Sequence, residues 1–174
     1  IYQYNDEYKK ALGYHQKAFE LFVKIKNEKL GLTALNSVGA CYTNLNDYKK
    51  ALNCYFQVLK IAETQNNESE MGLASGNIGL VFKRIGNFEK AYAYFGNSAK
   101  LDLCNLHNNT KDGIHTANMG GTYMAVVYGF GGLRLKENGL HLSPYLPPSW
   151  KAYHFRVAYR QCVIQVDVTL EATT

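Results

Sequence analysis

The sequence predicts an α+β protein in which a solenoid of helical hairpins is followed by one glycine-rich helix and a small antiparallel β-sheet. Three observations predict this order. A pattern of aromatic residues and glycines recurs at a spacing of 40 residues up to Lys100. A glycine-studded apolar run follows near Gly120. From Leu133 onward, apolar and polar residues alternate as they do on a half-buried strand.

The composition is that of a folded protein. Of the 174 residues, 47% are hydrophobic and 19% are charged, which is too apolar for a disordered chain. The net charge of +5 is not gathered into the dense basic stripe of a nucleic-acid binder, so no nucleic-acid partner is expected. No run reaches the roughly 18 apolar residues of a membrane helix, and the polar start "IYQYNDEYKK" does not resemble a signal peptide. We therefore expect no membrane association and a cytoplasmic location.

The four cysteines indicate neither a metal site nor a disulfide framework. Cys41, Cys54, Cys104 and Cys162 are scattered, with no C-x-x-C pair and no histidine cluster beside them. Free thiols packed as small apolar side chains are the expected state. No metal and no cofactor are predicted.

Two full copies of a repeat occupy most of the first hundred residues, and a partial copy with Tyr8 and Ala11 precedes them. Within each copy a short turn, "NLND" or "RIGN", separates two apolar patterns of helical spacing. Each copy is thus predicted to form two antiparallel helices, and the copies must stack because one pair cannot bury its apolar face. The matched pairs are Val38 with Ile78, Gly39 with Gly79, Tyr42 with Phe82, Tyr48 with Phe88, Ala51 with Ala91, and Tyr55 with Phe95.

These columns resemble the tetratricopeptide repeat (TPR) family over about residues 6–100. The resemblance implies a protein-binding scaffold whose groove is lined by the first helix of each pair. The amides of this groove could bond the backbone of an extended peptide, and its basic residues could attract an acidic one. Alternatively, the basic residues only solvate a helix end, where positive charge is favourable. The candidate groove residues are Asn36, Thr43, Asn44, Asn77, Lys83 and Arg84, with Leu73 and Leu80 beside them.

After Lys100 the repeat register fails, and a different architecture is predicted for residues 101–174. Asp112 can cap a helix over about residues 113–128. Gly120 and Gly121 each lower helix propensity by about 1 kcal/mol relative to alanine, so a neighbouring element must pack closely against them.

Antiparallel strands are predicted over about residues 132–170. The dipeptide Asn138-Gly139 favours a tight hairpin turn, with an alternating run on each side of it. Two longer alternating runs follow and predict a sheet with one buried face. Their apolar positions are Tyr153, Phe155, Val157 and Tyr159, then Cys162, Ile164, Val166, Val168 and Leu170.

Ordered motifs from Leu101 to Val168 resemble the C-terminal end of glycoside hydrolase family 65, the maltose, trehalose and kojibiose phosphorylases. The motifs are "NNTKDGIHTA", "GGTY", "VYGFGGLR", "GLHLSPYLPPSW" and "FRVAYR". The resemblance implies the last helix of an α/α barrel, a C-terminal β domain, and a phosphate-binding role for His115. A histidine in a first helical turn, beside free N–H groups, suits an anion, although a purely structural histidine fits equally well. Gln161 stands where the family often has glycine, which puts the geometry of the last hairpin in doubt.

Two functions from different classes are compatible with the sequence. The preferred interpretation is a protein-protein interaction module over residues 1–100, fused to a non-catalytic remnant of a phosphorylase. The alternative is a fragment of a family 65 disaccharide phosphorylase of carbohydrate metabolism, or a chimeric gene model. No catalytic residue is assigned, because no residue of the chain matches the family's catalytic glutamate. Phosphate or sugar is expected at the C-terminal segment only if other chains complete the site.

Overall fold

The computed structural model describes residues 2–103, 122–123, 125–136 and 138–171. It divides the chain into two compact units, the N-terminal unit Ile1–Met119 and the C-terminal unit Gly120–Thr174. The first contains helices and the second contains two antiparallel β-hairpins, which confirms the α+β class. The boundary predicted near residue 100 falls inside a helix that continues to Leu103, and the division into domains at that point stays a prediction.

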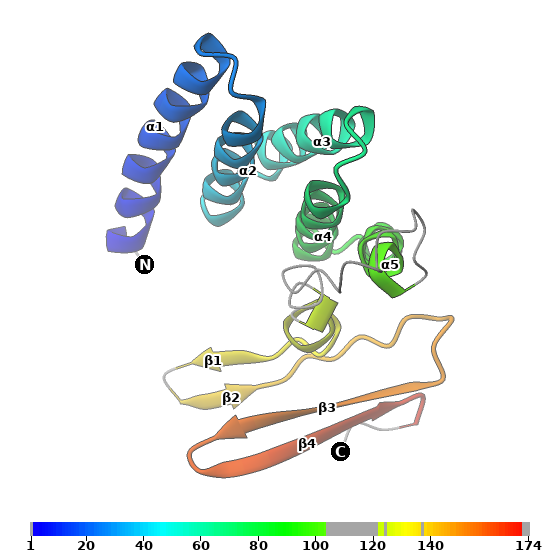
Figure 1. The fold of residues 1–174 in the computed structure, drawn as a ribbon. Coiled ribbons are helices and arrows are strands. Elements are labelled where there is room, and N and C mark those ends of the chain that lie inside the picture. The colour runs from blue at the N-terminus through cyan, green and yellow to red at the C-terminus, as the bar shows by residue number, and fades with distance from the viewer. Residues whose placement is uncertain (1, 104–121, 124, 137, 172–174) are drawn as a thin grey trace. The chain divides into compact units, whose positions relative to one another are not determined.

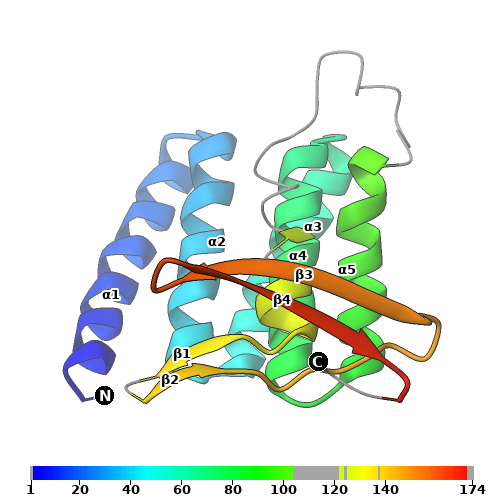
Figure 2. The same cartoon turned by 90° about the horizontal axis from the view of Figure 1, so that it is seen from below.

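Helices succeed one another along the N-terminal unit, and each packs against the next (Figure 1). Figure 2 shows them side by side, as expected of stacked helical hairpins. Their bounds are α1 Tyr2–Lys24, α2 Glu28–Asn44, α3 Tyr48–Thr64, α4 Glu68–Arg84 and α5 Phe88–Leu103.

The turns between these helices repeat every 20 residues, for a local reason. Residues 26, 46, 66 and 86 all have positive φ, between 50° and 80°. The next residue in each turn is Asn27, Asp47, Asn67 or Asn87, whose side chain accepts a hydrogen bond of 3.0–3.3 Å from the backbone N–H three residues on. Each helix therefore starts at its own cap, and the turn before it reverses the chain.

The core of the N-terminal unit is built from the predicted repeat columns. Ile78 and Val58 are fully buried, and Tyr55 is only 2% exposed. The glycine columns mark the closest approaches between helices. A Cβ on Gly39 would lie 2.6 Å from the ring of Tyr55, and a Cβ on Gly79 would lie 3.2 Å from the carbonyl oxygen of Ala91.

The C-terminal unit contains two separate two-stranded sheets where one small sheet was predicted. The first pairs β1 Arg134–Lys136 with β2 Gly139–His141, and the second pairs β3 Ala152–Tyr159 with β4 Cys162–Thr169. The chain between them, residues 142–151, contains all three prolines of the protein. Proline has no N–H to donate to a strand ladder, so this segment is not expected to form a further strand between the hairpins.

The alternation predicted for β3 and β4 holds in the structure. Phe155 pairs with Val166 and Tyr153 pairs with Val168, so that their side chains share one face. Phe155, Val166 and Val168 are buried in a cluster with Val127 and Leu133. The predicted buried face is therefore confirmed, although Cys162 and Leu170 at its ends are exposed.

Only the end of the helix predicted over residues 113–128 lies within the described residues. Thr122 and Tyr123 are helical, and Ala125–Phe130 form a single π-helical turn. In this turn the N–H of Gly131 donates to the carbonyl of Val126 over 2.7 Å, a spacing of five residues. Asp112, Gly120 and Gly121, on which the prediction rested, lie outside the described residues.

Gln161 adopts the left-handed backbone conformation that raised doubt about the last hairpin. Arg160 and Gln161 form the turn between β3 and β4, with φ of 48° and 66°. A type I′ turn has positive φ at both central positions, and glycine is the usual second residue. The hairpin thus forms with glutamine, at the cost of backbone strain.

We expect Gln161→Gly to raise the free energy of unfolding of the C-terminal unit by about 0.5 to 1 kcal/mol. A non-glycine residue in the left-handed conformation is strained by about 1–2 kcal/mol, and glycine removes this strain. The greater conformational freedom of glycine in the unfolded chain offsets part of the gain. Urea unfolding followed by the fluorescence of Trp150, the single tryptophan, measures the change. Ala158→Gly on β3 is the control and should lower stability. Destabilisation by both substitutions would contradict the strain argument.

Candidate functional site

The predicted groove residues of the repeats lie on α2 and α4, and the structure joins them in two pairs. The amide nitrogen of Asn77 donates to the amide oxygen of Asn36 over 3.0 Å. The Arg84 guanidinium donates to the carbonyl oxygen of Thr43 over 3.0 Å. Both contacts join residues 41 positions apart, so they link the same helix of successive repeats.

Thr43 belongs to the core rather than to an open surface. It is 3% exposed, its hydroxyl donates to the carbonyl of Gly39 over 2.9 Å, and it lies 3.2 Å from the Tyr55 hydroxyl. Burial raises the pKa of Tyr55, and the hydrogen bond with Thr43 opposes that rise. The hydroxyls of Thr43 and Tyr55 therefore have hydrogen-bond partners inside the repeat. Arg84 contacts Thr43 through its backbone carbonyl oxygen and not through its side chain.

The remaining predicted groove residues are partly accessible. Asn44 donates to the carbonyl of Ala40 in its own helix, over 2.9 Å, and Lys83 is half-buried. Leu73 and Leu80 are 42% and 36% exposed, and they lie four and three residues from Asn77 on α4. That spacing places them on one face of the helix with Asn77 between them. The resulting strip on α4 is apolar at its two ends and carries an amide at its centre.

Two of the three thiols described by the structure are packed as expected, and the third, Cys162, is exposed. Cys41 and Cys54 are buried and free, and Cys162 is exposed and free. Desolvation by burial raises the pKa of both buried thiols, which keeps them protonated at neutral pH. Among the described residues no group of three His, Cys, Asp or Glu side chains could hold a metal ion. No helix in the described part of the chain is long and apolar enough to cross a membrane.

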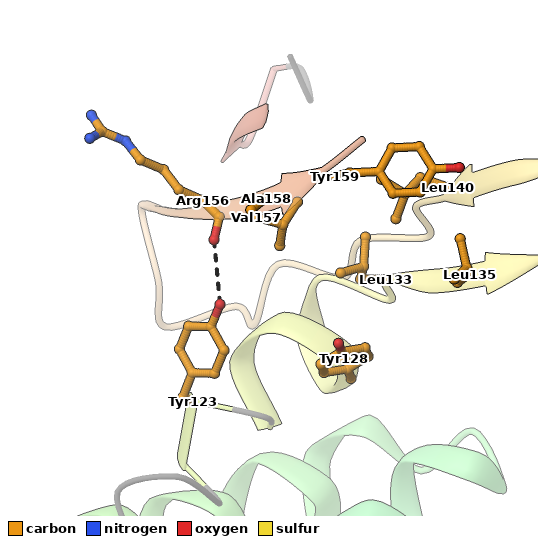
Figure 3. A pocket seen from close by; sticks show the side chains of 9 residues that line it. All are labelled: Tyr123, Tyr128, Leu133, Leu135, Leu140, Arg156, Val157, Ala158 and Tyr159. Atoms are coloured by element: carbon orange, nitrogen blue, oxygen red, sulfur yellow. Dashed lines mark hydrogen bonds between the residues drawn. The ribbon is translucent and has the colours of Figure 1, made fainter. Parts of the chain in front are cut away.

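The C-terminal unit contains a cavity of about 300 Å³, which we call the tyrosine cavity (Figure 3). It lies between the π-helical turn, the β1–β2 hairpin and the end of β3, from Arg156 to Tyr159. Its other lining side chains are Tyr123, Tyr128, Leu133, Leu135 and Leu140.

The walls of the tyrosine cavity are aromatic and aliphatic. Tyr123 is held in place by a hydrogen bond of 3.4 Å from its hydroxyl to the carbonyl of Arg156. The guanidinium of Arg156 donates to Gln165 over 3.0 Å, and Figure 3 shows it pointing away from the other lining side chains. No charged group of the lining residues is therefore directed into the cavity.

Sequence reasoning did not find this cavity. It placed Tyr159 and Val157 on the buried face of a strand, and Leu133, Leu135 and Leu140 on a hairpin, but each assignment concerned one element alone. The cavity exists because these elements meet with a gap between them, and side-chain periodicity carries no information about such a gap. The only sign of the cavity in the sequence was that most of its lining positions are apolar.

His115, to which the family resemblance assigns a phosphate-binding role, lies outside the described residues, so its role stays a prediction. His141 of the same segment is described. Its Nε2 lies 2.6 Å from the amide oxygen of Asn138, in the turn of the first hairpin. This contact gives His141 a structural role in that hairpin.

Three family models match the chain. Residues 1–64 match the tetratricopeptide repeat, residues 42–124 match the central catalytic domain of glycosyl hydrolase family 65, and residues 133–174 match the C-terminal domain of that family. The first two matches overlap over residues 42–64. The match to the catalytic domain therefore starts on the repeat helices, well before the predicted end of the repeats.

Several curated proteins resemble part of the chain. An α,α-trehalose phosphorylase of Geobacillus stearothermophilus is 49% identical over 104 residues, which cover 60% of this chain and 14% of that protein. A kojibiose phosphorylase of Thermoanaerobacter brockii is 38% identical over 92 residues, 52% of this chain and 12% of that protein. The chain thus spans between about an eighth and a seventh of the length of these relatives.

A solved structure supports the same relationship. It is described as a putative kojibiose phosphorylase from human microbiome, is 33% identical, and matches with a TM-score of 0.51 over 56% of this chain and 14% of that chain. Both resemblances predicted from the sequence are therefore confirmed as matches: residues 1–64 are similar to the tetratricopeptide repeat, and residues 42–124 and 133–174 are similar to two domains of glycosyl hydrolase family 65.

Proposed function

We propose that this chain supplies the C-terminal segment of a family 65 disaccharide phosphorylase. The observation that carries the proposal is the 49% identity to a trehalose phosphorylase over 104 residues. This identity favours a fragment of a phosphorylase over the interpretation preferred from the sequence, a binding module with a non-catalytic remnant. The chain spans only 14% of that relative. The family resemblance implies that the catalytic acid and the sugar-binding residues come from the barrel, and no residue of this chain matches the acid.

Within this proposal, His115 helps to hold the phosphate that attacks the glycosidic bond. Inverting phosphorolysis needs the phosphate on one side of the scissile bond and a proton donor on the other. A histidine beside the free N–H groups of a first helical turn can contribute to binding an anion. It cannot replace the proton donor, and the chain alone is therefore expected not to turn over.

A graft into the G. stearothermophilus trehalose phosphorylase tests the proposal. In the graft, the matched segment of that enzyme is replaced by the corresponding 104 residues of this chain. We expect phosphate-dependent release of glucose 1-phosphate from trehalose. His115→Ala in the graft should reduce the rate by about 100-fold, the usual effect of losing one donor to a reacting anion.

His141→Ala in the same graft is the matched control, because His141 contacts Asn138 in a hairpin turn. Its rate should stay within about threefold of the unmodified graft. A folded graft without activity would overturn the proposal for the segment. Equal losses for the two histidine substitutions would overturn the role of His115.

A second candidate function is peptide binding by the repeats, favoured by the strip of Leu73, Asn77 and Leu80 on α4. The strip offers apolar contacts at both ends, and Lys83 and Arg84 follow on the same helix. The amide of Asn77 between the two leucines also donates to Asn36, and Arg84 also donates to the carbonyl of Thr43. An acidic, extended peptide suits these groups.

Fluorescence anisotropy with a labelled decapeptide of alternating glutamate and alanine tests this candidate. We expect saturable binding that Lys83→Glu weakens at least fivefold and that added salt weakens further. Lys60→Glu makes the same charge change on α3, the second helix of its pair, and serves as the control. Equal weakening by both substitutions would indicate general charge attraction and contradict a groove on α4.

A further inference from the structure

We infer that the tyrosine cavity binds a neutral sugar ring, a function that goes beyond the proposed phosphate chemistry of the segment. Its volume of about 300 Å³ is at the lower end of the range for small-ligand sites. One pyranose ring, or one ring of a disaccharide, is a ligand of suitable size.

The aromatic side chains of the cavity are unusually accessible. Tyr123 is 51% exposed and Tyr128 is 39% exposed, and Leu135 on the facing hairpin is 70% exposed. Exposed apolar side chains that gather around a hollow, rather than scattering singly over a surface, mark binding sites. The side chains therefore form an apolar wall that stays open to solvent.

The tyrosine hydroxyls of the cavity favour a ligand that carries hydrogen-bonding groups. The Tyr123 hydroxyl already donates to the carbonyl of Arg156. Among the described residues, the hydroxyls of Tyr128 and Tyr159 make no hydrogen bond, so each can donate to or accept from a ligand. A sugar presents C–H groups on the faces of its ring and hydroxyls around its edge. Such a ligand matches phenol rings, which combine an apolar body with a polar tip.

The charges near the cavity argue against a cationic ligand. The guanidinium of Arg156 is directed away and engages Gln165, which in turn donates to Asp167 over 3.0 Å. The guanidinium carbon of Arg160 lies 5.2 Å from the ring centre of Tyr159, and this positive charge disfavours a cation at that ring. No lining residue is acidic, and the one lining cation is turned away. The guanidinium of Arg134 next to the cavity donates to the carbonyl oxygens of Tyr128 and Leu133, over 2.7 and 2.6 Å. A neutral, hydroxyl-rich ligand fits these surroundings best.

Saturation-transfer and chemical-shift titrations of the purified full chain with trehalose and with maltose test the inference. We expect saturable binding with a dissociation constant in the millimolar range. Tyr128→Ala and Tyr159→Ala should each weaken it at least tenfold. Tyr128→Phe keeps the ring and should weaken it about threefold. Val163→Ala, at an exposed position of β4 outside the cavity, is the matched control and should leave binding unchanged.

Trp150 fluorescence verifies that each variant is folded, so that a loss of binding is not mistaken for unfolding. No saturation with either sugar at 50 mM would overturn the inference. So would a loss with Val163→Ala equal to that with Tyr128→Ala, or tighter binding of glucose 1-phosphate than of either neutral sugar. These titrations need no turnover. If the chain binds sugar but the graft is inactive, the inference about the cavity holds and the proposed phosphorylase role is wrong. If the graft is active but the chain binds no sugar, the phosphorylase role holds and the inference about the cavity is wrong.

Discussion

Gly132→Ala is expected to lower the free energy of unfolding of the C-terminal unit by about 3 to 4 kcal/mol. Gly132 has φ of +62°, which costs a residue with a side chain about 1–2 kcal/mol. A Cβ at this position would also overlap the carbonyl oxygen of Ser143 and lie 2.7 Å from its carbonyl carbon. Because the obstacle is backbone, no side-chain rotation relieves it, and overpacking adds about 1–3 kcal/mol.

The fluorescence of Trp150 isolates the response of the C-terminal unit. Trp150 lies in this unit, and its ring centre is 5.4 Å from that of Phe130 and 5.5 Å from that of Tyr153. Urea unfolding followed by this signal is expected to shift to lower denaturant. The helical circular dichroism of the N-terminal unit should change little.

Two other glycine substitutions separate the cost of the positive φ from the cost of the steric overlap. Gly139→Ala meets no atom within 4 Å but has φ of +127°, so it should show the backbone cost alone. Gly129→Ala meets only the Cβ of Ala125, at an ordinary 3.9 Å, and should change stability least. The explanation would be wrong if Gly132→Ala cost no more than Gly139→Ala.

Gly39→Ala is expected to destabilise the N-terminal unit by about 2 kcal/mol, the opposite of what helix propensity alone predicts. Glycine lowers helix stability by about 1 kcal/mol relative to alanine, so alanine should help at this position in α2. The new Cβ, however, would lie 2.6 Å from one ring carbon of Tyr55 and 2.9 Å from another. The ring is 2% exposed and its hydroxyl contacts Thr43, which leaves it little room to move.

Thermal unfolding followed by circular dichroism at 222 nm measures this change. Gly96→Ala on α5 is the matched control, since a Cβ at that position meets nothing within 4 Å. It should raise the free energy of unfolding by up to about 1 kcal/mol. Stabilisation by both substitutions would show that Tyr55 can move aside and that contact with its ring does not limit the residue at position 39.

The helical repeat was largely predictable because its signals are local. The caps at Asn27, Asp47 and Asn67 bond backbone groups only three residues away, and they recur with the turns. The apolar columns of each copy follow helical spacing, and the glycine column of both copies lies where the two helices of a pair approach closely. Residues near one another in the chain therefore carry most of the information about this unit.

The candidate sites were less predictable because they depend on contacts between distant residues. Thr43 was expected to line a groove, but the structure buries it against Tyr55 and uses its carbonyl to hold Arg84. Asn36 and Asn77, expected to face a peptide, bond each other across 41 positions. Helical spacing shows on which face of a helix a residue lies. It does not show which residue of another helix forms a hydrogen bond with it.

The sequence by itself determined the order of the elements, the hairpin repeat, the alternating strands and the two family resemblances, because periodicity and turn chemistry act over a few residues. Only the tertiary structure decided that the strands form two separate hairpins, that Gly132 contacts the backbone of Ser143, and that a cavity remains between the first hairpin and β3. Those features come from how closely elements far apart in the chain approach one another. Close packing sets that distance, and it depends on all the side chains between the elements at once.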